Sequence, residues 1–311
     1  MSIIDPFSSI DPLARPTVAT VGTFDGVHLG HRALLLRVVE EAAARGGKSV
    51  ALVFKEQPRA FIKPGVTVSY LCDFATRRAL LNEIGIDEIV ELEFGPEIQQ
   101  LSSAGFVTGL QARIGLQALV VGPGARIGSD RAGVEELVAA GTGDVDFIAA
   151  PAEAVAGQMV SSSAVRRAIT AGDCELTAAM LGRNYAISGT VATGERRGQE
   201  LGFPTANIEP DSNIVIPANG IYATLAGVEG TAAGAEFLAA TSIGVRPTFE
   251  IDGRRTVEAF LLDFDGDLYT QRLRLEFVTR LRSEVAFESA EQLVEQMNKD
   301  VAQTRQVLAA R

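Results

Sequence analysis

The chain has 311 residues, of which 47% are hydrophobic and 22% charged, and its formal net charge is −11 at pH 7. Its length exceeds the roughly 100 to 200 residues of a single domain, so two domains are predicted, and the ordinary composition excludes a disordered chain. The acidic balance argues against a nucleic-acid partner, because neutralising phosphodiesters needs a basic surface. Residues 1–16 do not resemble a signal peptide, and no stretch is long enough to span a membrane, which favours a cytoplasmic protein with no membrane partner.

The two cysteines, Cys72 and Cys174, lie far apart in the sequence. This pattern suits a reducing compartment and predicts neither a disulfide framework nor a zinc site. We expect both to be buried small apolar side chains.

Up to about residue 182 the chain alternates β-rich runs with helical stretches, as in a parallel sheet with crossover helices. The apolar run 17–22 predicts a buried strand, and the amphipathic stretch 32–47, which ends on two glycines, predicts the first helix. Further strands are predicted at 49–54, 87–94 and 117–122, and further helices at 74–85, 161–172 and 173–182. This order predicts an α/β fold.

After residue 182 the pattern changes to period-two strands with no helix between them, which predicts an antiparallel sheet or a small barrel. These strands are expected at 184–195, 220–228, 235–245, 256–264 and 271–281. A last helix should begin at a capping box formed by Ser289 and Gln292. Its apolar stripe, expected to pack on the barrel, consists of Leu293, Met297, Val301 and Leu308. The predicted domains are therefore 1–182 and 183–311.

The only two histidines, His28 and His31, follow the first strand in the segment GTFDGVHLGH. This places them at the first turn of a helix at the carboxyl edge of a parallel sheet, where ligands bind in open α/β folds. Helix N-termini favour anions, both imidazoles would share one helical face, and Gly30 between them leaves the backbone open to a phosphate. Three alternatives stay open, namely zinc ligands, hydrogen-bonded core histidines and general acid–base groups.

A second candidate site lies in the string GERRGQELGFPTANI. Gly194, Gly198 and Gly202 recur every four residues before a strand and predict a flap whose amides can close over phosphates. Thr205 and Asn207 share one face of that strand and offer a hydroxyl and an amide oxygen, which suit Mg²⁺. The alternative is a glycine-rich hairpin in which Thr205 and Asn207 make local turn bonds.

Glu258 interrupts the otherwise apolar strand segment TVEAFLL. A charge in such a run either faces water or is retained for a task. Phosphoryl transfer to an alcohol needs a base near the hydroxyl, and Glu258 is the candidate. The pattern alone leaves both interpretations open.

The segment GTFDGVHLGH resembles the signature of the nucleotidyltransferase superfamily, in the form found in bacterial bifunctional riboflavin kinase/FMN adenylyltransferases, also called FAD synthetases. The segment VSSSAVRRAI resembles the second signature of the same family. The resemblance implies that His28 and His31 stabilise the transferred phosphates and that Asp25 has a structural or ligand-orienting role. The ATP-binding and phosphate-binding residues that it implies are Gly22, Phe24, Asp25, Gly30, Ser161, Ser162, Ser163 and Arg166.

The segments GQELGFPTAN, GIYAT, SIGVRPTF and VEAFLLDFDGDLYTQRLRLEFVTRLR resemble the riboflavin kinase domain. The implied fold is a Rossmann-like nucleotidyltransferase domain followed by a six-stranded antiparallel β-barrel with a C-terminal helix. In this resemblance Thr205 and Asn207 bind Mg-ATP, and Glu258 activates the ribityl 5′-hydroxyl. The implied reactions are phosphorylation of riboflavin to FMN by ATP and adenylylation of FMN to FAD with release of pyrophosphate. The expected partners are these small molecules, and no oligomeric state is assigned.

Two segments depart from the family pattern. Where family members carry an acidic residue, a proline and then His or Arg, this chain has FKEQP, which keeps Phe54 and Pro58 around Lys55, Glu56 and Gln57. In VVGPGARIG the glycines at 122, 128 and 133 are kept, but Gly124 and Ala125 replace a polar and aromatic pair. These departures leave two alternatives to a bifunctional enzyme, namely a riboflavin kinase with a degenerate N-terminal domain and a flavin-binding regulatory protein without turnover.

Overall fold

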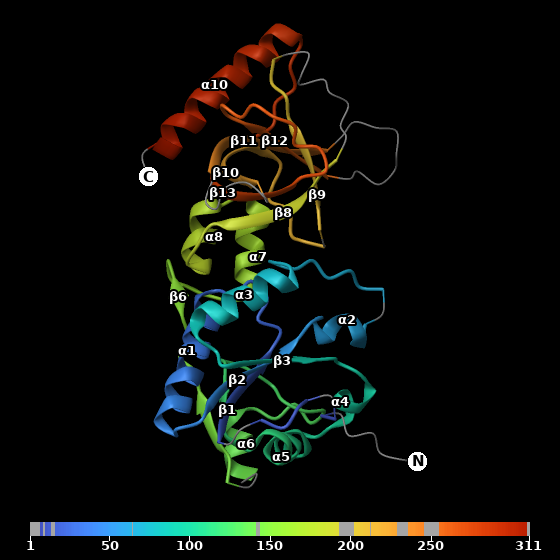
Figure 1. The fold of residues 1–311 in the computed structure, drawn as a ribbon, viewed down its shortest axis with the longest axis vertical. Coiled ribbons are helices and arrows are strands. Elements are labelled where there is room, and N and C mark those ends of the chain that lie inside the picture. Colours follow the sequence, from blue (N-terminus) through green and yellow to red (C-terminus); the bar gives the residue numbers. More distant parts are fainter. Residues whose placement is uncertain are drawn as a thin grey trace. The chain divides into compact units, whose positions relative to one another are not determined.

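The structure is a computed structural model that describes residues 7–8, 10–13, 16–63, 65–140, 144–192, 202–211, 213–228, 236–245 and 255–309. The chain divides into two compact units. Unit 1 comprises Met1–Val68 and Phe74–Ser161, and unit 2 comprises Ser69–Asp73 and Ser162–Arg311. The boundary after residue 182 stays a prediction, and the two helices that precede it belong to unit 2 (Figure 1).

Unit 1 is built on a five-stranded parallel sheet in the order β3-β2-β1-β4-β5. The strands are β1 (Thr17–Gly22), β2 (Lys48–Phe54), β3 (Glu88–Leu92), β4 (Leu116–Val121) and β5 (Asp146–Ala149). The helices are α1 (Leu29–Ala44), α2 (Pro58–Ile62), α3 (Phe74–Ile84), α4 (Pro96–Gln100), α5 (Ser103–Ile114) and α6 (Val134–Ala140), and a short β6–β7 hairpin (Ala154–Val155, Gln158–Met159) follows β5. Because the strand order reverses between β1 and β4, the carboxyl ends of these strands form the edge where open α/β sheets bind ligands.

Both faces of this sheet are buried. Along β2, Val50 and Leu52 join a core cluster with residues of α5, whereas Ala51 and Val53 join a second cluster with residues of α1 and α3. A parallel sheet covered on both faces has nearly continuous apolar strands, which is the pattern that the sequence shows. The predicted α/β fold of this part is confirmed.

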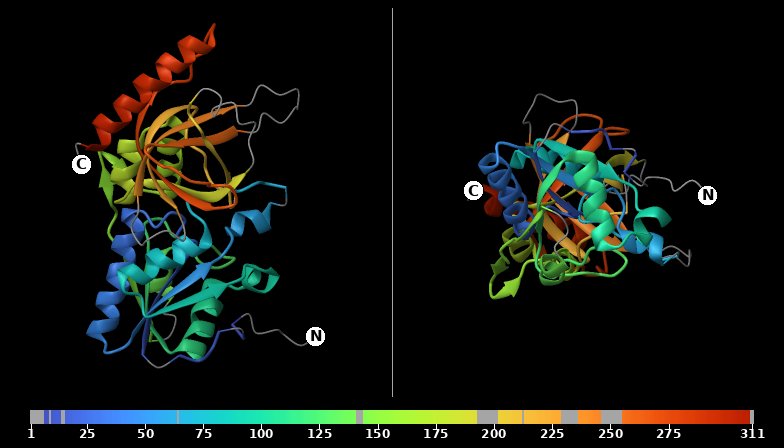
Figure 2. Two further views of the ribbon diagram at one scale, coloured as in Figure 1. Left: turned by 45° about the horizontal axis from the view of Figure 1, so that its top comes forward. Right: turned by 90° about the horizontal axis from the view of Figure 1, so that it is seen from below.

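Unit 2 contains a closed six-stranded antiparallel barrel in the order β10-β11-β12-β9-β8-β13. The strands are β8 (Tyr185–Ala192), β9 (Ala206–Pro210), β10 (Gly220–Val228), β11 (Glu236–Val245), β12 (Arg255–Leu261) and β13 (Arg272–Arg282). The helices are α7 (Ser162–Ala171), α8 (Cys174–Leu181) and α10 (Ala290–Ala309). Helix α10 contacts β10, β11 and β13 and lies along the outside of the barrel (Figure 2). The predicted barrel with a C-terminal helix is confirmed.

The start of α10 differs in one bond from the predicted capping box. The backbone N–H of Gln292 donates to the hydroxyl of Ser289 at 3.3 Å, as predicted. The side-chain oxygen of Gln292, however, accepts from the backbone N–H of Glu288 at 3.2 Å, one residue before Ser289. The return bond from the Gln292 side chain therefore goes to the N–H of Glu288 and not to that of Ser289.

A short segment from the first quarter of the sequence completes unit 2. The N–H of Tyr70 donates to the carbonyl of Asn213 at 2.7 Å, and the N–H of Val215 donates to the carbonyl of Tyr70 at 2.9 Å. These bonds form a parallel bridge between Tyr70 and Ile214. Residues 69–73 therefore pair with residues that lie about 140 positions later in the chain.

Candidate active sites

The candidate phosphate site of unit 1 is the turn between β1 and α1. Phe24 and Val27 have φ values of 50° and 39°, in the left-handed region that non-glycine residues rarely adopt. The N–H of Val27 donates to the carbonyl of Phe24 at 3.0 Å and closes the turn. Backbone strain of this kind persists only where the surroundings hold it, and it is concentrated at functional sites.

His28 is the N-cap of α1, and its Nδ1 accepts the backbone N–H of His31 at 3.2 Å. An accepting Nδ1 carries no proton, so the proton of a neutral imidazole is on Nε2, which can donate to a ligand. The ring is 5% exposed and packs against Gly30, where an added Cβ would lie 3.3 Å from the imidazole. Gly30 therefore makes room for His28, whereas the sequence argument assigned that space to a ligand.

His31 stacks on His28, with 3.7 Å between ring centroids and 16° between the ring planes. It also makes a T-shaped contact with the ring of Phe24, with 5.4 Å between the ring centroids. Burial, the charge of His28 and the charge of Arg77, in that order, hold the pKa of His31 well below 6.5. The imidazole is therefore neutral at pH 7, and its Nδ1 is buried without a hydrogen-bond partner among the described residues.

Three other predicted residues shape this turn. Gly22 lies beside the ring of Phe24, which an added Cβ would meet at 3.1 Å, and Phe24 itself is buried. Asp25 is 2% exposed and accepts a hydrogen bond from the side chain of Gln57 at 3.4 Å. Gln57 stands where the family carries His or Arg, so one of the departures from the family pattern contacts the signature turn directly.

The second signature lies at the start of α7. Ser162 and Ser163 begin the helix, Ser161 precedes it, and Ser161 and Ser163 are exposed. Arg166 is half-buried and donates to the carbonyl of Ser69 at 3.1 Å. Ser161 belongs to unit 1 and the other three residues belong to unit 2.

In the VVGPGARIG loop, the backbone conformation and the close packing at Gly128 require a glycine. Gly128 has φ +74°, and an added Cβ would lie 2.1 Å from the backbone nitrogen of Ser103. Asp130 accepts the backbone N–H of Ser103 at 2.9 Å and its hydroxyl at 2.8 Å, which joins this loop to the start of α5. Gly124, in contrast, has φ +68° and open space beside it, where an added Cβ would meet nothing within 4 Å.

Sequence reasoning missed an aromatic cluster at the same edge of the sheet. Phe54 ends β2, Phe94 follows β3, and their rings lie 5.6 Å apart. Phe61 of α2 lies 5.8 Å from Phe94 and is 43% exposed. The signal in the sequence was a phenylalanine at or just after each of two parallel strands, and the cluster offers an aromatic surface to a planar ligand.

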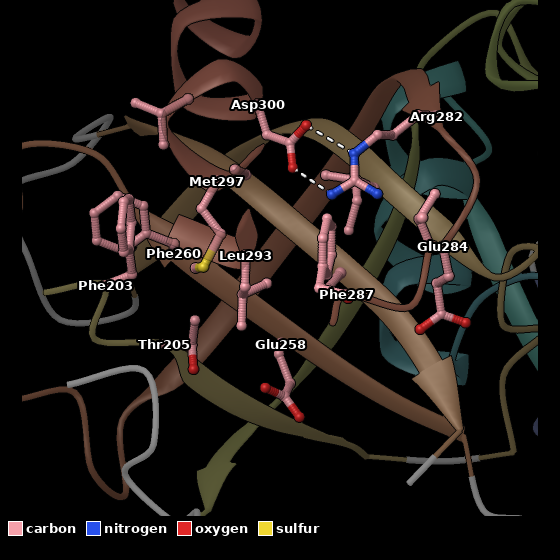
Figure 3. A pocket seen from close by; sticks show the side chains of 15 residues that line it. Phe203, Thr205, Glu258, Phe260, Arg282, Glu284, Phe287, Leu293, Met297 and Asp300 are labelled. Atoms are coloured by element: carbon pink, nitrogen blue, oxygen red, sulfur yellow. Dashed lines mark hydrogen bonds and ion pairs between the residues drawn. The ribbon is translucent and has the colours of Figure 1, made fainter. Parts of the chain in front are cut away.

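In unit 2 a cavity of about 330 Å³ lies between the outer face of the barrel and α10 (Figure 3). Its volume is within the range of small-molecule sites. Thr205 and Glu258 both line this cavity, and Figure 3 draws their side chains below those of Arg282 and Asp300. The apolar wall includes Phe203, Phe260, Phe287, Leu293 and Met297, so three aromatic rings and the stripe of α10 face the same space.

The structure places Glu258 on the outer face of the barrel, and its role as a base stays a prediction. On β12, Val257 and Ala259 point into the barrel and are buried, so Glu258 points outward, but into the cavity beneath α10. Glu258 is paired with Asn207 on β9 and with Ser242 on β11, and residues paired in this way share one face of the sheet. The structure therefore brings Asn207, Glu258 and Ser242 to one face of three adjoining strands, with Thr205 two residues before Asn207.

A buried ion pair holds α10 beside this cavity. Arg282 of β13 donates to both carboxylate oxygens of Asp300, at 2.8 and 2.6 Å, and Gln296 donates to Asp300 at 2.9 Å. Asp300 is 4% exposed. This two-bond geometry is the strongest arrangement of an arginine and a carboxylate.

The predicted glycine flap lies mostly outside the described residues. Gly194 and Gly198 are not described, and Gly202 is exposed with φ +87°. Within the described ranges no group of three or more His, Cys, Asp or Glu is placed to hold a metal ion. None of the described helices is long and apolar enough to cross a membrane.

Comparisons with known proteins match both halves of the chain. A family model described as FAD synthetase matches residues 10–164, and one described as riboflavin kinase matches residues 181–308. A bifunctional riboflavin kinase/FMN adenylyltransferase of Pseudomonas fluorescens is 36% identical over 312 residues, which cover 99% of this chain and 98% of the relative. The chain belongs to this family.

A family member of the same name from Escherichia coli K12 is 32% identical, and the match covers 93% of this chain and 92% of the relative. The family member from Listeria monocytogenes is 30% identical, and the match covers 94% of this chain and 92% of the relative. A crystal structure described as a macrolide-efflux protein from Streptococcus pneumoniae has a TM-score of 0.86 and 27% identity, and the match covers 94% of this chain and 95% of that one. The chain is therefore a bifunctional riboflavin kinase and FMN adenylyltransferase, rather than a kinase alone or a flavin-binding regulator.

Proposed function

We propose that the two activities are divided between the two sites. The barrel cavity with Glu258 phosphorylates riboflavin, and the turn with His28 and His31 transfers AMP from ATP to FMN. The observation that carries this division is that each site lies within the part of the chain matched by the corresponding family model.

In the kinase site the apolar wall of the cavity receives the flavin ring, and the ribityl 5′-hydroxyl lies at Glu258. The Glu258 carboxylate accepts the hydroxyl proton as the oxygen attacks the γ-phosphoryl group of ATP. Thr205 and Asn207, on the same face, bind Mg-ATP. In this proposal the flavin ring and the reacting hydroxyl lie at opposite ends of one cavity, which is supported by its apolar wall and by Glu258 in its lining.

The oxygen donors of this site fit Mg²⁺, which prefers hydroxyl, amide and carboxylate oxygens together with substrate phosphates. Thr205 and Asn207 would hold the ion, and when bound it would neutralise charge on the transferred phosphoryl group. Since the chain carries a net charge of −11, ATP alone would be repelled at long range. Activity therefore requires Mg²⁺.

In the adenylyltransferase site the N-terminus of α1 and the Nε2 donor of His28 stabilise charge that develops on the phosphates of ATP. The rings of Phe54, Phe61 and Phe94 offer a stacking surface for the flavin of FMN, which compensates for the missing aromatic residue near Gly124. Ser161, Ser162, Ser163 and Arg166 bind the triphosphate. The proposed location is the cytoplasm, since both cysteines are buried thiols outside any disulfide.

The test follows both products in one preparation. The purified protein is incubated with Mg-ATP and either riboflavin or FMN, and the flavins are resolved by chromatography. Glu258→Gln should lower FMN formation by about 10² to 10⁴-fold and leave FAD formation from FMN intact. His28→Ala should abolish FAD formation and spare FMN formation, and chelation of Mg²⁺ should stop both reactions. Equal loss of both activities in either folded variant would contradict the proposed division.

A further inference from the structure

Arg77 on α3 is the largest of the fully buried side chains among the described residues, with 1% of its surface exposed. A buried guanidinium is costly unless its N–H groups are hydrogen-bonded. Nη1 of Arg77 donates to the backbone carbonyls of Thr23 at 2.9 Å, Phe54 at 3.1 Å and Lys55 at 3.3 Å. One side chain therefore binds three carbonyls that belong to two different strand ends.

These carbonyls lie at the edge of the sheet where the histidine turn begins. Thr23 directly follows β1, and Phe54 ends β2 with Lys55 after it. The ring of Phe74, at the start of α3, lies 5.3 Å from the guanidinium carbon. Arg77 thus ties the loops after two neighbouring parallel strands to each other and to α3.

The link from Arg77 to the imidazoles runs through the strained turn. Thr23 precedes Phe24, whose φ of 50° is held in the left-handed region and whose ring packs against His31 at 5.4 Å. The titratable and charged groups that act on His31 are His28, stacked on it, and Arg77, on the side of α3. Thr23, which Arg77 holds through its carbonyl, is thus directly followed by the residue whose ring contacts His31.

We propose that Arg77 is a positioning residue of the adenylyltransferase site, which fixes the turn that presents His28 and His31 to the substrate phosphates. This inference rests on the proposed role of the two histidines. Arg77 touches no reacting atom and acts through the backbone of Thr23 and the ring of Phe24.

The neighbouring Arg78 provides a matched control. It is exposed and its guanidinium pairs with Glu91 at 2.9 Å on the surface of unit 1. The same substitution at 77 and 78 therefore removes the same side chain from the same helix, once from beneath the turn and once from solvent.

The first measurement compares Arg77→Met, Arg77→Lys and Arg78→Met in the full-length enzyme with Mg-ATP. In Arg77→Met the kcat for FAD formation should fall by about 10²-fold, the effect expected when a reacting group is misplaced by about 1 Å. Arg77→Lys should also be slow, because the lysine side chain is one bond shorter than the reach of Nη1 and has no planar guanidinium to lie beside the ring of Phe74. Arg78→Met should stay within about twofold of the wild type, as should FMN formation in all three variants.

The second measurement is an NMR titration of the imidazole signals, which number two because the chain has two histidines. His28→Gln assigns them. Removing the cation in Arg77→Met should raise the pKa of His31, whereas Arg77→Lys, which retains a charge, should leave it lowered. A merely structural role would lower the unfolding midpoint without changing the ratio of the two activities, and the titration reports separately whether the charge of Arg77 acts on His31.

An unchanged kcat for FAD formation in folded Arg77→Met, with an unchanged His31 titration, overturns the inference. Should Arg77→Met fail to fold, an unchanged kcat for FAD formation in Arg77→Lys overturns it instead. If His28→Ala and His31→Gln also leave FAD formation unchanged, the proposed function fails. If those two variants abolish FAD formation and Arg77→Met does not, the proposed function stands and the role of Arg77 is rejected.

Discussion

The imidazole of His31 illustrates how a single residue responds to the fold around it. Burial lowers its pKa first, and the nearby charges of His28 and Arg77 lower it further. In the unfolded chain the same imidazole has its ordinary pKa of 6.5. A group whose pKa is lowered by folding resists protonation only in the folded state, so it makes folding depend on pH.

The pH dependence has a definite sign. As the pH falls below 6.5 the unfolded chain binds a proton at His31 before the folded chain does, so the free energy of unfolding decreases until the pH reaches the folded pKa. His31→Gln removes this contribution. We expect urea unfolding to show that the free energy of unfolding decreases more between about pH 7.5 and about pH 5.5 in the wild type than in His31→Gln. The difference should be about 1.4 kcal/mol for each unit of pKa shift that is titrated. Equal losses in the two proteins would contradict a lowered pKa.

Residue types and spacing identified the histidine turn and the set of Thr205, Asn207 and Glu258, but not what surrounds them. The period-two pattern shows that Glu258 points out of the barrel, and it cannot show that α10 covers this outward face. Arg77 looks like any charged residue on an amphipathic helix, because its burial depends on carbonyls that lie 22, 23 and 54 residues away in the sequence. Side chains that act through tertiary contacts carry no local signal.

At the scale of elements, α10 depends on two ion pairs in different surroundings. Asp300 is buried and bonded twice by Arg282, whereas Arg305 on the same helix pairs at 2.7 Å with Asp263, whose side chain is 71% exposed. Both pairs tie α10 to the barrel, but only the first borders the cavity. Breaking a buried pair leaves a charge without its partner in a low dielectric, while water replaces an exposed partner.

Asp300→Asn should therefore lower the free energy of unfolding by about 3 to 5 kcal/mol, and the matched Asp263→Asn should have a much smaller effect. Asp300→Asn should also raise the KM for riboflavin, since α10 forms the apolar wall of the cavity. Denaturant unfolding and the kinase assay measure the two effects. Similar stability of the two variants, together with an unchanged KM, would show that the buried pair does not hold α10 in place.

Elements with a regular hydrophobic period were predicted correctly, including β1, α1, β2 and the barrel strands. Helix α5 was missed, although Ser102 caps its start by accepting the N–H of Gly105 and Gly115 ends it with φ 65°. Its sequence SAGFVTGLQARI contains two glycines and a threonine, which weaken helix propensity, so packing against the sheet rather than local preference makes it helical. Tertiary contacts override propensity in short elements of this kind.

At the scale of the whole chain, both cysteines lie in unit 2 and both are buried. Burial first, and then the charges of Glu175 and Asp173, raise the pKa of Cys174 to about 12. The thiol is therefore protonated at any ordinary pH, and a thiol reacts far more slowly than a thiolate.

Ellman's reagent at about pH 8 should consequently label neither Cys72 nor Cys174 in the native protein, and should label both once urea opens unit 2. The rate of labelling below the unfolding transition then measures the opening of unit 2. Cys174→Ser serves to assign the two thiols. Rapid stoichiometric labelling without denaturant would contradict the burial of these side chains.

Unit 2 is assembled from two separate stretches of sequence, because residues 69–73 pair with the loop at 213–215. In a hybrid enzyme made by joining two relatives at residue 182, Tyr70 would come from one parent. The loop at 213–215, with which it forms backbone hydrogen bonds, would come from the other. An exchange of the kinase half between relatives is therefore viable only if this pairing is preserved. Recombination between distant relatives should succeed most often when residues 69–73 travel with the barrel.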